Sequence, residues 1–206
     1  MTGTGRFRHQ PAAFVLCLLL FSGCGKVRYP TTYVLDFPDL APNAAAAKPI
    51  LGAVVVREFR CPKYLCDGRI VFRPSPEEVG FYEFHRWAVD PRESITLFLT
   101  NTLRARSIFT HVASQERDIT AAYVLTGSIE RMEEVDRGHA VHAECAISAQ
   151  LVNLQTGSVV WSDTAFETVA VQKRNMTGVV NSLTAAAQIV VERLVSSLAN
   201  QFVTQH

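Results

Sequence analysis

The stretch from Ala140 to Leu154 constrains the fold of this chain most strongly, because apolar and polar residues alternate along it. One set of alternate positions is apolar or small: Val141, Ala143, Cys145, Ile147, Ala149 and Leu151. The positions between them include His142, Glu144, Ser148 and Gln150. Since successive side chains of a β-strand point to opposite sides, the pattern predicts a long strand with one buried face and one solvated face.

Shorter apolar runs predict the other strands. The segment 153–157 is typical of a turn, and 159–161 should then form a hairpin with the long strand. The strands expected before it span residues 32–36, 50–59, 69–73, 81–87 and 123–130. We expect a bend from Pro38 to Pro49, and we expect Pro74, Pro76 and Gly80 in the loop between 69–73 and 81–87.

Apolar spacing predicts two helices. Asp90 is a suitable N-cap, with Pro91 at the first helical position and Glu93 at the third. This helix should reach about Arg106 and bury a stripe made of Ile95, Phe98, Leu99 and Leu103. A second stripe runs toward the C-terminus through Val180, Leu183, Ala187, Val190, Leu194 and Leu198.

Length and composition fit one globular domain, with 206 residues of which 48% are apolar and 19% charged. The expected order of elements is strands, helix, strands, helix. We therefore predict an α+β fold in which both helices pack on one face of a mostly antiparallel sheet. The 20 lysines and arginines are balanced by 19 aspartates and glutamates, which argues against nucleic acid as a partner.

The first residues predict export from the cytoplasm. Arg6 and Arg8 precede an unbroken apolar run from Ala12 to Phe21. As a helix this run would span only about 15 Å, half of the hydrocarbon layer, so a signal peptide is favoured over a membrane-spanning helix. Ser22 and Gly23 then precede Cys24, which resembles the bacterial lipobox, with phenylalanine in place of the usual leucine.

The lipobox resemblance implies that residues 1–23 are a lipoprotein signal peptide and that Cys24 receives diacylglycerol and an N-acyl chain such as palmitate. Residues 24–31 would be a membrane tether and 32–206 the folded domain. Gly25, where aspartate would favour retention, implies transfer to the outer membrane, facing the periplasm. The alternative is a cleaved signal peptide that leaves Cys24 free. Cys17 is a poorer site, because cleavage there would leave an apolar N-terminus.

Cys61 and Cys66 flank a predicted turn, and export would place them in an oxidising compartment. A structural disulfide is therefore expected. The alternatives are a reduced pair and redox catalysis, although redox motifs usually have a two-residue spacing between the cysteines.

The segment 81–87 is rich in aromatic residues. Alternation places Tyr82, Phe84 and Arg86 on one side of a strand, and Phe81, His85 and Trp87 on the other. The first side is either a half-covered surface of the domain or a contact for a partner or for lipid.

Catalytic and metal motifs are weak in this sequence. His139, His142 and Cys145 have spacing that suggests metal ligands, but strand alternation points His142 away from the other two. The chain has no nucleophile elbow, phosphate-binding glycine loop or zinc-protease motif. We expect neither an enzyme nor a bound metal or cofactor.

Several short motifs resemble the ABC-type transport auxiliary lipoprotein family, whose best-known branch is the paraquat-inducible C lipoproteins. They are the lipobox, 33–35, the valines 54–56, Tyr64-Leu65 ahead of 69–73, and Tyr82 leading to 85–88. The resemblance is strongest from Val54 to Leu103. Cys66 and the segment 89–91 depart from the family pattern.

This resemblance implies a periplasmic partner of a mammalian-cell-entry phospholipid transport system. The protein would dock the periplasmic tunnel protein at the outer membrane, contact membrane lipid, and act indirectly with an inner-membrane ABC permease and ATPase. A homo-oligomeric ring would suit such a role. One alternative is an envelope lipoprotein that binds the cell wall or its synthases without moving lipid, and another is a periplasmic hydrolase.

We expect Cys24→Ala to move the protein from the detergent phase to the aqueous phase in a detergent-partitioning experiment. The reason is that two or three acyl chains bind a bilayer far more firmly than one chain or none. If the wild-type protein and the variant are equally soluble in buffer, the acylation hypothesis is wrong.

Overall fold

The structure is a computed structural model that describes residues 28–40, 51–114, 120–138 and 140–203. The predicted leader 1–23, Cys24, most of the predicted bend and His139 lie outside these ranges. The described elements are β1 (Thr31–Tyr33), β2 (Val54–Val56), β3 (Arg69–Ser75), β4 (Glu78–Trp87), α2 (Pro91–Ala105), β5 (Val112–Ala113), β6 (Tyr123–Asp136), β7 (Val141–Asn153), β8 (Val159–Ala170) and α3 (Met176–Val203).

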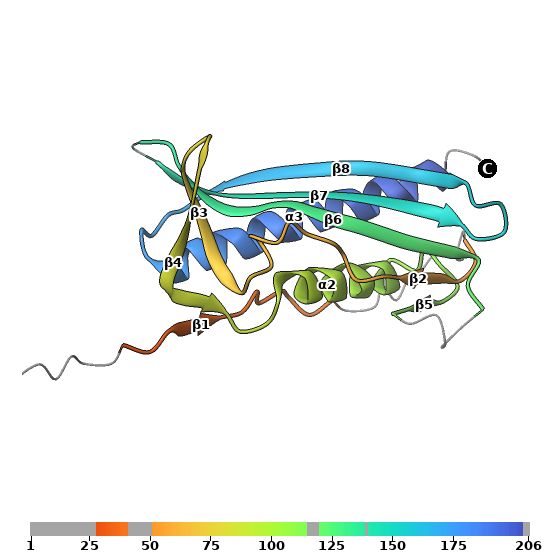
Figure 1. Ribbon diagram of the computed structural model, residues 1–206. Helices are drawn as coiled ribbons and strands as arrows, with labels where there is room; N and C mark the ends of the chain where they lie inside the picture. Colours follow the sequence, from red (N-terminus) through yellow and green to blue (C-terminus); the bar gives the residue numbers. More distant parts are fainter. Residues whose placement is uncertain (1–27, 41–50, 115–119, 139, 204–206) are drawn as a thin grey trace, which may run out of the picture.

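Three long strands form the centre of the sheet. β6, β7 and β8 pair in antiparallel order and run nearly the length of the molecule (Figure 1). The predicted inner face of β7 is confirmed, because Ala143, Cys145, Ile147 and Leu151 have no exposed surface. The predicted hairpin is also confirmed, although β8 extends well beyond Trp161, to Ala170.

The sheet is mixed, which corrects the expectation of a mostly antiparallel one. Two short strands pair one after the other with the same edge of β6. β2 pairs with residues 123–125 of β6 and β3 with residues 133–135, and both run parallel to β6. β2 also pairs in parallel with β5, and β1 with β4. The physical reason is the length of β6, which continues six residues past the predicted end at Glu130 and offers an edge to both strands.

Both predicted helices form with the predicted buried stripes. The Asp90 side chain caps α2 by accepting a hydrogen bond of 2.8 Å from the backbone N–H of Arg92. α3 covers the inner face of β7 and β8, and α2 packs against α3 on the same side of the sheet (Figure 1). By length and composition α3 could cross a membrane. However, just over half of its most apolar 18-residue stretch is buried in the domain.

Two loop predictions are wrong. Gly80 belongs to β4, where the Phe72 ring of β3 lies directly over it, and a side chain at that position would collide with the ring. Pro74 belongs to β3, just past its last pairing with β6 at Arg73, so its missing N–H breaks no ladder there. The expected strand 50–59 is shorter than predicted, with only Val54–Val56 in regular pairing.

Gly127 should not accept a side chain. A Cβ atom there would lie 2.6 Å from Cζ of Phe59, which is buried and held by a hydrogen bond from its backbone N–H to the Thr96 hydroxyl of α2. We expect Gly127→Val to lower the free energy of unfolding by about 1–3 kcal/mol, as overpacking does. Urea denaturation measures this, and Ser128→Val on the same strand is the control. Equal midpoints for the two variants would contradict the prediction.

Candidate functional site

The end of the sheet that carries β1 and β4 is the first candidate site. β1 lies at the sheet edge and pairs in parallel with β4, with Thr32 opposite Arg86 and Tyr33 opposite Trp87. The backbone N–H of Ala88 extends the pairing by donating to the Tyr33 carbonyl at 2.8 Å. The predicted tether therefore leads directly into a strand that is fixed to the sheet.

A bulge in β4 separates the three residues predicted to share a contact face. Arg69 pairs with Arg86 and Val71 with Phe81, so four residues of β4 stand opposite Ile70 alone. Such an excess breaks the alternation of side chains. The Tyr82 ring meets the His85 ring edge-on at 5.8 Å, so Tyr82 shares a face with His85 rather than with Arg86.

Phe84 and Arg86 remain on the outward face of the β1–β4 pair. The guanidinium carbon of Arg28 lies 4.7 Å from the centre of the Phe84 ring, in a cation–π contact. Arg86 is exposed, and so are Thr32 and Val34 of the neighbouring chain segment. This face combines two arginines with apolar surface.

The opposite face of the same pair holds an aromatic cluster. The Tyr33 hydroxyl lies 3.1 Å from Nδ1 of His85, and the Tyr82 hydroxyl donates to Oε2 of Glu134 at 2.7 Å. Burial raises the pKa of Glu134, the Tyr82 hydrogen bond lowers it in part, and the charge of Asp136 raises it further. Burial, followed by the same hydrogen bond, also raises the pKa of Tyr82. The cluster stabilises the bulge but holds no nucleophile activated by a base.

The metal-ligand pattern gains no support from the described residues. Among them no group of three or more histidine, cysteine or acidic side chains lies close enough to hold a metal ion. Cys145 is buried on the inner face, where desolvation raises the pKa of its thiol to about 12. His142 pairs with Val135 on the other face. The two side chains that can be placed therefore point apart, as alternation requires.

A disulfide joins Cys61 to Cys66, whose Cα atoms are 6.4 Å apart. Two backbone hydrogen bonds close the turn inside it, from Leu65 to the Pro62 carbonyl and from Cys66 to the Lys63 carbonyl. The loop sets Tyr64 beside Arg73 and Glu133, where burial and then the Glu133 charge raise the pKa of its hydroxyl. The disulfide thus holds the loop that places Tyr64 over part of the outer face of the sheet.

Two buried carboxylates lie on that outer face, which was predicted to be solvated. Glu133 and Glu144 face each other across β6 and β7 and are 0% and 1% exposed. Arg73 holds Glu133 through two hydrogen bonds of 2.7 and 3.0 Å. Arg131 and Arg137 both bind Glu144. Three guanidinium groups thus offset two buried charges that would otherwise repel each other.

A cleft of about 730 Å³ opens beside these ion pairs, between the disulfide loop, the β3–β4 turn and β6. The cluster was not predicted from the sequence, because Glu144 was expected among solvated residues and the preceding strand was expected to end at Glu130. The signal present in the sequence is the run of charges at 130–137, which contains two arginines and four acidic residues. Paired strands bring such residues together only when the register is known.

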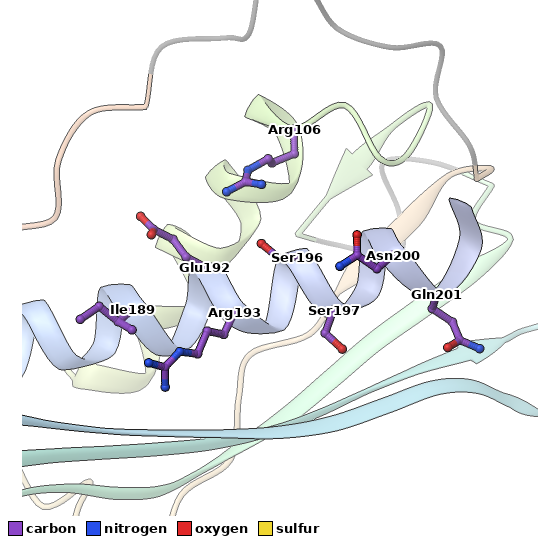
Figure 2. A pocket seen from close by; sticks show the side chains of 8 residues that line it. All are labelled: Arg106, Ile189, Glu192, Arg193, Ser196, Ser197, Asn200 and Gln201. Atoms are coloured by element: carbon purple, nitrogen blue, oxygen red, sulfur yellow. The ribbon is translucent and has the colours of Figure 1, made fainter. Parts of the chain in front are cut away.

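A second groove, of about 910 Å³, follows α3 beside the end of α2. Figure 2 shows its lining, which is almost entirely polar: Arg106, Ile189, Glu192, Arg193, Ser196, Ser197, Asn200 and Gln201. Arg193 reaches across to β8, where it donates to the Phe166 carbonyl at 2.9 Å and pairs with Glu167.

The free edge of β8 is protected by side chains of β8 and of α3. β8 pairs only with β7 among the described strands. Two of its backbone N–H groups, on Thr164 and Thr168, donate to the carboxylates of Asp163 and Glu167. With Arg193 on the Phe166 carbonyl, these contacts occupy groups that an added strand would need. A partner strand is therefore disfavoured along the middle of β8.

The comparisons with known proteins decide the family. The model of the ABC-type transport auxiliary lipoprotein component matches residues 33–195. The chain belongs to this auxiliary lipoprotein family. The resemblance predicted from the short motifs is thereby confirmed. The family is one of auxiliary lipoproteins and not of enzymes.

Solved structures support the fold of this auxiliary lipoprotein. The crystal structure of XCC0632 from Xanthomonas campestris has a TM-score of 0.71 at 20% identity, and the match covers 85% of this chain and 100% of that one. An uncharacterized protein has a TM-score of 0.65 at 14% identity, covering 82% and 99%. Hypothetical protein CT253 from Chlamydia trachomatis has a TM-score of 0.52 at 7% identity, covering 76% and 99%. No curated protein sequence matches the chain.

The two buried carboxylates of the auxiliary lipoprotein should differ in their contribution to stability. Arg73, the partner of Glu133, is 19% exposed, whereas Arg131 and Arg137 are 52% and 59% exposed and can be hydrated without Glu144. We expect Glu133→Gln to cost about 2–3 kcal/mol and Glu144→Gln about 1 kcal/mol. Urea denaturation at neutral pH measures both. A cost for Glu144→Gln equal to or above that for Glu133→Gln would contradict this account.

Proposed function

We propose that the protein is the lipid-anchored periplasmic component of an ABC and mammalian-cell-entry phospholipid transport system, and that it docks the tunnel protein at the outer membrane. The observation that carries the proposal is the match of the auxiliary lipoprotein model to residues 33–195. An auxiliary component needs no catalytic residues of its own, since an ATPase supplies the energy. Its work is to hold a partner at a fixed place.

The geometry of the domain supports a docking role. β1 lies at one end of the long strands, and the turn between β7 and β8 lies at the other end (Figure 1). A 13-residue strand such as β7 extends about 43 Å. An anchored domain of this shape can therefore present its far end to a partner well away from the membrane surface.

Acylation at Cys24 and the outer-membrane location belong to the same proposal. The family is one of lipoproteins, and Gly25 follows the predicted acylation site. A homo-oligomeric ring around the tunnel end would give several anchors to one partner, and would multiply a weak contact by raising its effective concentration. Inner-membrane permease and ATPase would be reached through the tunnel and not directly.

The test is a crosslinked pull-down from membranes of cells that produce the acylated protein, with partners identified by mass spectrometry. We expect the mammalian-cell-entry tunnel protein and, at lower yield, the ABC permease. Gly25→Asp is the matched control, because it keeps the acyl anchor but favours retention in the inner membrane. Recovery of the tunnel protein should fall with this variant. Recovery of peptidoglycan synthases without the tunnel protein would contradict the proposal and favour the cell-wall alternative.

A further inference from the structure

We propose that the outward face of the β1–β4 pair lies against the phospholipid surface of the membrane that carries the Cys24 anchor. This inference rests on the acylation that the proposed function includes. The face consists of Arg28, Val34, Phe84 and Arg86, and the exposed Tyr29 follows Arg28 in the chain. It adds a direct contact between the folded domain and lipid to the covalent anchor.

The chain between the acylated cysteine and the domain is short. Three residues separate Cys24 from Arg28, the first described residue. Even fully extended, this segment spans no more than about 14 Å. The sheet edge at β1 must therefore stay near the headgroups whenever Cys24 is acylated.

Strand pairing gathers exposed apolar and basic residues on one face. Thr32 stands opposite Arg86 in the parallel pair, so Val34, two residues further, shares their side. Val34 is 50% exposed, and Tyr29, which follows Arg28 in the chain, is 80% exposed. Phe84 lies on the same side beneath Arg28.

The residue types on this face suit a phospholipid surface. Arginine side chains can lay their methylene groups on apolar surface while the guanidinium binds lipid phosphate, and tyrosine is well suited to the polar boundary of a bilayer. Exposed carboxylates at Glu83 and Asp36 border the face and limit its extent. The contact is thus narrow, and it orients a domain that the acyl chains already hold.

The other exposed large apolar residues in the described part of the chain lie elsewhere. Val89 lies between β4 and α2, Leu97 is on α2 and Phe166 is within β8. Leu154 and Val159 flank the β7–β8 turn at the far end of the long strands (Figure 1). The turn offers a matched control, because Leu154 is 49% exposed, close to the value for Val34.

The experiment uses the acylated full-length protein in vesicles of phosphatidylethanolamine and phosphatidylglycerol. Val34→Cys and, separately, Leu154→Cys are labelled with a small fluorophore, and lipids carrying a nitroxide near the headgroup serve as quencher. Native thiols do not interfere, since Cys61 and Cys66 are paired and Cys145 is buried. We expect fluorescence at position 34 to fall by about half and at position 154 by less than about a tenth, as a shallow interfacial contact at one end requires.

A second variant separates the contact from the anchor. Arg86→Glu in the Val34→Cys background should reduce quenching at position 34, while the protein still floats with the vesicles. Thermal unfolding of each labelled variant checks that the domain is intact. If the protein floats with the vesicles but the fluorophore at position 34 is quenched no more than the one at position 154, the lipid contact alone is overturned. Loss of flotation in the wild-type protein would overturn the anchor, and with it both proposals.

Discussion

The packing of α3 on the inner face of β6, β7 and β8 is the interaction on which the rest of the domain depends. Leu183, Ala187 and Val190 have no exposed surface, and the same is true of Ile147 and Leu151 on β7. One helix of 28 residues thus covers most of the apolar side of the sheet. The rest of the core is completed by α2 and by the short strands β2 and β3, which pack around the contact between α3 and the sheet.

Because the inner face is filled by apolar packing, polar and charged groups are left to the outer face and the ends. The outer face is not uniformly solvated. Near the β6–β7 turn it buries Glu133 and Glu144 among three arginines, under the loop closed by Cys61 and Cys66. Toward the β7–β8 turn it is lined mainly by small and polar residues, together with Arg57 and Arg60. The face of the β1–β4 pair, the cleft and the α3 groove are therefore separate surfaces with different chemistry.

Local patterns in the sequence predicted what local physics controls. The cap at Asp90, both helical stripes and the inner face of β7 depend on spacing within one element, and all three are confirmed. The parallel partners of β6 and the burial of Glu144 depend on register between segments far apart in the chain, which spacing does not encode. Tyr82 was separated from Phe84 and Arg86 because a bulge in β4 interrupts the period of two on which the prediction relied. The family resemblance rested on short motifs within single segments, so it did not depend on how the strands pair.

The parallel pairing of β1 with β4 has a mechanical consequence for a protein held by its N-terminus. A pull on the tether along the strand would load the β1–β4 hydrogen bonds in shear, so that they would have to break together and not one after another. The contact of Tyr33 with His85 and the burial of Trp87 brace the same junction. A strand of only three residues would thus transmit force from an N-terminal anchor to the whole sheet.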